Sequence, residues 1–370
     1  MIPYGHQTID QKDINSVLAV LQSDWLTQGP KVLEFEKALA KYCGAKYAVS
    51  ACNGTAALHL AYLAAGLKKG DEVITTPNTF AATTNMLLAV GAKPVFTEIR
   101  LDSYNLDENQ IEKLINKKIK AIVPVHFAGQ PADLAKIKKI AKKHRLLVIE
   151  DACHALGAKY HGNKIGDCRY SDLAVFSFHP VKTITTGEGG VILTNNKKFY
   201  DQLILLRNHG IYKDKNGKNV MVELGYNYRL NDLACALGIS QLKKIKPIIS
   251  KKRQIAQWYN EELKNVKEVI LPKELKGNYS SWHLYIVRVD KKYRDLLAKY
   301  LKQKDIGVNF HYPAVYSYPY YQKLGFGKNN LKNSKIYHQT TLTLPLPPQL
   351  MKSQVKYISN QIKFFFGYEV

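Results

Sequence analysis

The spacing of apolar positions differs between two kinds of segment in the first two thirds of the chain. Short apolar runs rich in β-branched residues alternate with stretches in which apolar residues recur every three or four positions. The runs predict strands at 47–52, 71–77, 93–99, 120–127, 146–151, 173–178 and 190–194. The other stretches predict helices at 32–43, 54–67, 83–90, 107–115 and 132–144, the fourth behind an N-cap at Asp107. This alternation implies crossover connections, so we expect an α/β fold with a mainly parallel central sheet flanked by helices.

The last third of the chain follows a different pattern. A long helical stretch from Leu230 to about Lys246 leads into Pro247 and a second amphipathic segment. Beyond it the pattern predicts a strand at 282–289, a helix at 293–303, an extended piece at 307–313 and a closing helix near the end. We therefore predict a large domain over 1–246 and a smaller C-terminal α+β domain over 247–370.

Composition narrows the class of protein. With 370 residues, 46% of them hydrophobic, the chain can bury a sizeable core. No apolar run approaches the roughly 20 residues of a membrane span, and residues 1–11 lack the pattern of a signal peptide, so we expect a cytoplasmic protein without a membrane partner. The five cysteines are scattered and form no C-x-x-C pair, which predicts neither a disulfide framework nor a metal site.

The formal net charge of +24 allows a nucleic-acid interaction, because basic surfaces attract polyanions. The lysines are nevertheless spread over many helices, and the sequence has no basic tail and no nucleic-acid motif. We interpret them as solvated helix faces and expect no nucleic-acid partner. A groove for a polyanion is the alternative, and a positive field also favours capture of a small anion such as a nucleotide diphosphate sugar.

Candidate chemistry lies where the predicted strands end, the usual ligand-binding edge of such sheets. Gly54 and Thr55 follow the first strand and open a helix, whose free N–H groups and dipole suit a phosphate. An Asn-Gly turn that merely starts a helix is the alternative. Asp151 and His154 follow the fifth strand; the aspartate is either a helix cap or a functional carboxylate.

Another strand supplies an amine. In the segment LAVFSFHPVKTITTGEGG the apolar strand runs out at Ser177, and the chain then reaches Lys182 among small residues. Lysines normally lie on solvated faces, and one that is desolvated in a pocket has a lowered pKa, as Schiff-base formation requires. The glycines of GEGG let the backbone pass close to a bound group. An amine, a carboxylate and a phosphate-binding turn at one sheet edge together favour an active site.

The sequence resembles a known family over essentially its whole length. The resemblance lies in WLTQGPKVLEFEKALAKYCG, ACNGTAALHLAYLAAGL, DEVITTPNTFAATTNMLLAVGAKPVF, IEDACHALGAKY, FSFHPVKTITTGEGG, LRNHGI and GYNYRLNDLACALGISQL. These segments are similar to those of the DegT/DnrJ/EryC1/StrS aminotransferases, fold type I enzymes that use pyridoxal 5'-phosphate (PLP) and act on nucleotide-linked sugars. The resemblance implies a PLP-dependent transferase fold of type I and a homodimer with shared active sites.

Roles for the strand-end residues follow from this resemblance. Lys182 would form the Schiff base with PLP and later move a proton between the amino donor and the cofactor. Asp151 would bind the pyridine nitrogen and keep it protonated. His154 would lie near the phenolic oxygen of the cofactor.

Further cofactor contacts are implied in the same way. Gly54, Thr55 and Ser177 would hold the phosphate, and Phe80 would stack on the ring, although an aromatic residue at a helix start is more often part of the core. Asn227 matches an asparagine that in relatives reaches into the neighbouring subunit's site.

Substrate contacts are also implied by the resemblance alone. The residues that match segments lining the sugar-nucleotide pocket in relatives are Tyr4, Trp25, Leu26, Thr27, His311, Tyr312 and Tyr316. The reaction implied is transfer of an amino group from L-glutamate, which leaves as 2-oxoglutarate, to a UDP-linked 4-keto-6-deoxy-N-acetylhexosamine.

Three alternatives remain open. A transaminase acting at C3 or on a GDP- or dTDP-linked sugar would carry the same motifs, because fold-level likeness does not choose the substrate. A sugar dehydratase of the family has a histidine in place of the lysine, and Lys182 disfavours it. A catalytically silent binding protein would be expected to have lost residues such as Asp151 and Lys182, which are present.

Overall fold

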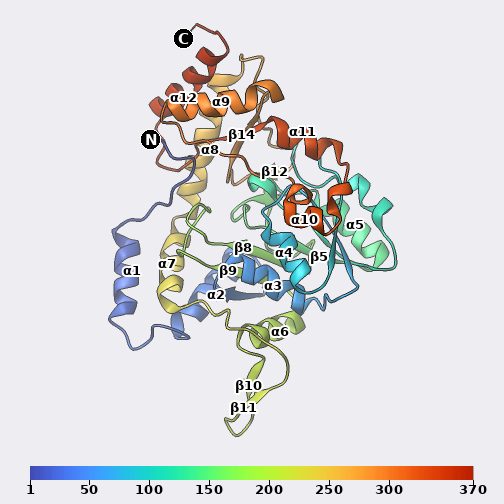
Figure 1. Cartoon of the computed structure of the whole chain (residues 1–370). Helices are drawn as coiled ribbons and strands as arrows, with labels where there is room; N and C mark the ends of the chain where they lie inside the picture. Colours follow the sequence, from blue (N-terminus) through green and yellow to red (C-terminus); the bar gives the residue numbers. More distant parts are fainter. Residues whose placement is uncertain (370) are drawn as a thin grey trace.

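The computed structural model of the chain, described over residues 1–369, is built around one seven-stranded sheet with helices on both faces (Figure 1). The strand order is β1-β9-β8-β5-β4-β2-β3. The pairs of β9 with β1 and β8 are antiparallel, and the other pairs in this sheet are parallel. All strands except β9 therefore end at the same edge, and the predicted α/β class with a mainly parallel sheet is confirmed.

The elements follow the pattern of apolar positions closely. The strands are β1 (Tyr47–Ala51), β2 (Glu72–Thr75), β3 (Lys93–Phe96), β4 (Ile119–Val123), β5 (Leu147–Asp151), β6 (Lys159–Tyr160), β7 (Asn163–Lys164), β8 (Leu173–Ser177), β9 (Gly190–Thr194), β10 (Ile211–Lys213), β11 (Asn219–Met221), β12 (Asn278–Tyr279), β13 (Tyr285–Arg288) and β14 (Thr341–Leu344). The helices are α1 (Gln11–Leu21), α2 (Pro30–Cys43), α3 (Gly54–Ala64), α4 (Ala82–Ala89), α5 (Leu134–His144), α6 (Lys197–Arg207), α7 (Asp232–Lys243), α8 (Ile245–Leu263), α9 (Lys291–Gln303), α10 (Pro319–Lys323), α11 (Lys332–Thr340) and α12 (Lys352–Phe365).

One predicted helix is wrong. Residues 107–115 form two single 3₁₀ turns, Glu108–Gln110 and Glu112–Leu114, although the Asp107 carboxylate does cap the first by accepting from the Asn109 N–H at 3.0 Å. The buried Glu108 carboxylate is held by Arg100 at 2.9 Å and Lys136 at 3.2 Å. These tertiary ion pairs fix the direction of the segment, and such contacts outweigh a weak helical propensity.

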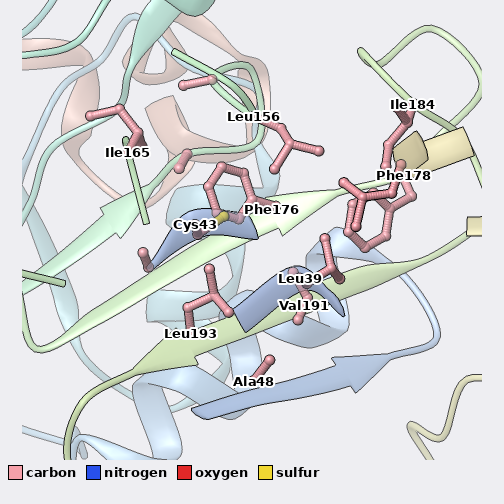
Figure 2. Packing of buried hydrophobic residues seen from close by; sticks show 14 of the residues in the cluster. Leu39, Cys43, Ala48, Leu156, Ile165, Phe176, Phe178, Ile184, Val191 and Leu193 are labelled. Atoms are coloured by element: carbon pink, nitrogen blue, oxygen red, sulfur yellow. The ribbon is translucent and has the colours of Figure 1, made fainter. Parts of the chain in front are cut away.

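The sheet holds its two helical layers through separate apolar cores. On one face, Phe176 and Leu193 of the sheet pack against Leu39 and Cys43 of α2, as Figure 2 shows. On the other face, the nearly continuous apolar surface of α3 packs against β8 and β9. Strands buried on both faces need apolar side chains at every position, which explains the unbroken apolar runs in the sequence.

A further core belongs to the C-terminal part and is joined to the first by α8. Ile245 and Ile249 of α8 pack with the sheet layer, whereas Ile255 and Leu263 pack with β13, β14, α9 and α12. Pro247 lies in the first turn of α8, where its missing N–H leaves no hydrogen bond broken. The division at 246/247 stays a prediction, since α8 runs continuously through both cores.

The first residues of the chain pack with this C-terminal core. Ile2 forms a parallel bridge with Ile306, and its carbonyl accepts from the Gly307 N–H at 2.7 Å. In Figure 1 the N-terminus accordingly lies beside the C-terminal helices, far from α1. This route carries Tyr4 toward the edge of the sheet, where the candidate site lies.

Within residues 1–369 no helix is both long and apolar enough to cross a membrane. The same residues contain no group of three or more His, Cys, Asp or Glu side chains arranged to hold a metal ion.

Candidate active site

A cavity of about 520 Å³ opens at the edge where the parallel strands end. It is lined by residues that follow β1, β2, β5 and β8, together with residues from the N-terminal segment and the C-terminal part. The predicted site residues that line it are Tyr4, Gly54, Thr55, Phe80, Asp151, His154, Ser177, Lys182, His311 and Tyr312. The sheet thus gathers in one place residues that lie up to about three hundred positions apart in the sequence.

Lys182 lies in the loop that leaves β8, and its side chain is largely withdrawn from solvent. Burial lowers the pKa of its ammonium group, and the neighbouring Cys153 and Asp151 oppose this shift. A lowered pKa increases the fraction of free amine, the form that attacks a carbonyl carbon. Lys182 therefore has the chemistry that covalent attachment of a cofactor aldehyde requires.

Asp151 ends β5 and is held rigidly in the floor of the cavity. Its Oδ2 accepts from the Thr83 hydroxyl at 2.6 Å, and its Oδ1 accepts from the Cys153 N–H at 3.2 Å. The Thr79 hydroxyl lies 2.7 Å from that of Thr83, so the carboxylate is the end of a short chain of hydrogen bonds. Held in this way, one carboxylate can face a protonated ring nitrogen without rearranging.

The residues predicted to hold a phosphate at the start of α3 lie together in the lining of the cavity. Asn53 caps the helix, its side chain accepting from the Ala56 N–H at 2.8 Å. A Cβ placed on Gly54 would lie 2.8 Å from the Ser177 Cβ, so only glycine lets the helix start approach the end of β8 this closely. The first N–H groups of a helix have no partner inside it, and the hydroxyls of Thr55 and Ser177 lie beside them. This donor set fits a phosphate monoester.

His154 and the aromatic residues form the opposite wall. The His154 Nε2 lies 3.3 Å from the Tyr312 hydroxyl, and its Nδ1 is buried without a hydrogen-bond partner in residues 1–369. Burial lowers the pKa of His154 well below its usual value, with further contributions from Lys182, His311 and Lys252. Phe80 is exposed over 58% of its surface and leans toward Tyr312, the ring centroids being 5.7 Å apart. An exposed aromatic at the mouth of a cavity can stack on a bound ring.

The remaining predicted residues do not line the cavity within this chain. Trp25, Leu26 and Thr27 are exposed and run antiparallel to the segment before α7. Asn227 is exposed and bridges to Asn208. Their roles stay predictions.

Tyr316 does not line the cavity either. Its ring packs edge-on against Phe96, in a small apolar cluster under α10, with the centroids 6.1 Å apart. Its role as a substrate contact also stays a prediction.

Three further residues that line the cavity were not among the predicted site residues, namely Thr83, His283 and Asn309. Thr83 lies three positions after Phe80, so the placement of Phe80 on a helix start could have indicated it. His283 precedes β13 and Asn309 follows α9, and neither lies in a sequence pattern that points to a ligand.

The geometry defines a site of the PLP type: a desolvated lysine facing a fixed carboxylate, with a phosphate cradle beside them. The chain belongs to the DegT/DnrJ/EryC1/StrS aminotransferase family, whose model matches residues 7–363. The predicted class of enzyme and, at the level of the family, its cofactor are therefore confirmed.

Particular relatives refine this assignment. The chain is 41% identical over 368 residues, covering 98% of it and 96% of the relative, to UDP-4-amino-4,6-dideoxy-N-acetyl-beta-L-altrosamine transaminase of Campylobacter jejuni subsp. jejuni serotype O:23/36 (strain 81-176). Among solved structures it is similar to Helicobacter pylori PseC, described as an aminotransferase involved in the biosynthesis of pseudoaminic acid, with a TM-score of 0.94, 36% identity and 99% of each chain covered. The PLP-form of the putative sugar aminotransferase Spr1654 from Streptococcus pneumoniae superposes with a TM-score of 0.93 at 29% identity over 98% of each chain.

Proposed function

We propose that this protein is a PLP-dependent aminotransferase that moves an amino group from L-glutamate to C4 of a UDP-linked 4-keto-6-deoxy-N-acetylhexosamine. The observation that carries the proposal is the pairing of the desolvated Lys182 with the fixed carboxylate of Asp151 across one cavity. The substrate is supported by the 41% identity to the named Campylobacter transaminase and by the likeness to PseC.

Several residues that line the cavity have distinct tasks in this reaction. PLP, when bound, supplies a ring that withdraws electrons from the donor's α-carbon. The Lys182 amine would hold the cofactor aldehyde covalently and, when free, would accept the proton from the donor's α-carbon. The Asp151 carboxylate keeps the pyridine nitrogen protonated, which its hydrogen bonds from Thr83 and Cys153 support.

The other residues hold the ligands. Gly54, Thr55 and Ser177 bind the phosphate through helix N–H groups and hydroxyls, and Phe80 covers one ring face. For the sugar, the cavity offers the hydroxyl, imidazole and amide groups of Tyr4, His311, Tyr312 and Asn309. These groups suit a hydroxyl-rich ligand, because each can donate or accept a hydrogen bond.

We further propose that two copies of the chain assemble and that Asn227 of one copy reaches into the cofactor site of the other. The hairpin of β10 and β11 projects away from the body of the protein (Figure 1) and, with the residues after it, exposes apolar side chains at Tyr212, Met221, Val222 and Leu224. Trp25 and Leu26 are exposed as well. Apolar side chains gathered on projecting segments are typical of subunit interfaces. A cytoplasmic location remains a prediction.

The absorption spectrum of the purified protein tests the chemistry. Wild type loaded with PLP is expected to show the visible band of a lysine-bound cofactor, and L-glutamate is expected to convert it to the amino form. Lys182→Ala should bind the cofactor without this band. The substrate is then tested by mixing the amino form with UDP-, GDP- and dTDP-linked 4-keto sugars. Return of the band with the UDP-linked 4-keto-6-deoxy-N-acetylhexosamine alone supports the proposal, whereas return with another sugar only would replace the substrate and leave the chemistry intact.

A further inference from the structure

A second histidine packs against His154 in the lining of the cavity. The imidazole of His283 is buried, with 4% of its surface exposed, and its ring centroid is 4.3 Å from that of His154. The two rings come from different parts of the fold, since His154 follows β5 and His283 precedes β13 of the C-terminal core. Neither Nδ1 atom has a hydrogen-bond partner within residues 1–369. Buried polar atoms without partners are uncommon in proteins, so this pair calls for a functional reason.

The backbone around His283 is fixed against the large domain. The His283 N–H donates to the Ala128 carbonyl at 2.9 Å, and the Ser281 hydroxyl donates to the His154 carbonyl at 3.0 Å. Gly129 makes this approach possible, because a Cβ there would lie 2.9 Å from the His283 nitrogen and 2.6 Å from the Ser281 Oγ. These two hydrogen bonds fix the backbone that carries the His283 ring beside His154.

We propose that His283 is a positioning residue for the transamination: its ring, packed against that of His154 with the two planes inclined by 42°, holds the His154 imidazole beside Tyr312 and keeps water away from it. The inference rests on the function proposed above. His283 itself lines the cavity, and in that scheme it acts through His154, the residue expected near the phenolic oxygen of the cofactor. A side chain whose orientation is fixed by packing reaches its productive geometry without loss of entropy on binding.

The charges around the pair favour two neutral rings. The groups that face His154 are Lys182 from the β8 loop, Lys252 from α8, His311 and Tyr312 from the segment after α9, and Asp151 and Cys153 from its own loop. Lys252 is buried and its Nζ lies 3.4 Å from the His283 carbonyl.

Burial is the main cause that lowers the pKa of both histidines, and the nearby lysines add to it. A proton added to either ring would place a further charge in this buried, already cationic region.

Two replacements of His283 distinguish packing of its ring on His154 from direct contact of its nitrogens with a ligand. His283→Phe keeps a flat ring and removes both nitrogens, whereas His283→Ala removes the ring and opens space for water. His338→Ala is the control, because His338 is partly buried in α11 near Arg294 and does not line the cavity. Unfolding midpoints of all variants establish that each is folded.

The first readout uses cofactor-free protein. Ring resonances of His154 in NMR spectra are expected to stay constant from pH 7.5 to 5.5 in wild type and His283→Phe, and to titrate in His283→Ala. The second readout is turnover, where we expect kcat to fall by about 10–100-fold in His283→Ala with a smaller change in KM, and to stay near wild type in His283→Phe.

Two results would overturn the proposal. If His154 still does not titrate in His283→Ala and kcat is unchanged, packing of the His283 ring on His154 has no positioning role. If His283→Phe is as impaired as His283→Ala, the nitrogens contact a ligand directly. Because the NMR titration needs neither cofactor nor substrate, it remains informative even if the wild type does not transaminate, an outcome that contradicts the proposed function alone.

Discussion

Replacing Gly54 by alanine is the sharpest test of the phosphate cradle. The added Cβ would lie 2.8 Å from the Ser177 Cβ, 3.1 Å from its Oγ and 3.5 Å from its Cα. Contacts under 3.0 Å force a shift, and the backbone of β8 is held in the sheet on both sides. The first turn of α3 must therefore move away from Ser177, and the two halves of the cradle separate.

The change in stability and in PLP affinity expected for Gly54→Ala follows from two opposing free-energy contributions. Overpacking of this kind costs about 1–3 kcal/mol, whereas the higher helix propensity of alanine returns at most about 1 kcal/mol. If the strain is relieved by moving the helix start, the loss appears in cofactor binding, where about 1.4–2.8 kcal/mol corresponds to a tenfold to hundredfold weaker affinity. We thus expect Gly54→Ala to raise the PLP dissociation constant by that factor.

The assay is a titration of cofactor-free protein with PLP, followed by absorbance, alongside unfolding in urea. Gly327→Ala is the control, because the nearest atom to its Cβ would be the Gln322 Cγ at 3.3 Å, in a flexible side chain, and the Gln322 Cα would lie 3.7 Å away. An unchanged dissociation constant in Gly54→Ala would refute the reasoning, whether or not stability falls, because the cradle would then tolerate the displacement.

Three other changes should have measurable effects. Thr83→Val removes the hydroxyl that donates to Asp151 at 2.6 Å. Because hydrogen bonds to charged groups contribute about 1.5–3 kcal/mol, kcat/KM should fall about tenfold or more. Unchanged kinetics would contradict the role of this hydrogen bond. Arg207→Met leaves the buried Glu36 carboxylate without its cation. We expect the free energy of unfolding, measured in urea, to fall by about 3–5 kcal/mol. Adding Glu36→Leu should recover most of this loss, because it removes the unpaired charge. Burial, aided by the charge of Lys182, lowers the pKa of His311 to about 4. The unfolded state then binds more protons below pH 6.5, so the unfolding free energy should fall by up to about 3 kcal/mol as the pH drops from 7 toward 4, and His311→Gln should show a smaller fall.

The fold was largely predictable because strands buried on both faces leave an unmistakable pattern. Runs such as LAVFSF and GVILT match β8 and β9 within a residue or so. The failure at 107–115 has a physical cause, since the Glu108 carboxylate is held by Arg100 and Lys136, a tertiary contact that no local pattern records.

The site was predictable only in part. Asp151 ends β5, and Gly54 and Lys182 lie within a few residues of the ends of β1 and β8, so the sheet brings them to one edge. His283 and Asn309 reach the cavity through the packing of the C-terminal core, and residues that depend on how two cores meet carry no signal in their own neighbourhood. Asn227 and Trp25 are exposed and do not line the cavity, so their roles stay predictions.

The bridge between Ile2 and Ile306 has a consequence for synthesis of the protein. At about 5–20 residues per second, a ribosome takes roughly 15–60 s to pass from the first of these residues to the second. During that interval the N-terminal segment has no strand to join, and Tyr4 cannot reach its place at the cavity. The sheet core can form while translation continues, but the site is complete only after the C-terminal core has left the ribosome and captured the start of the chain.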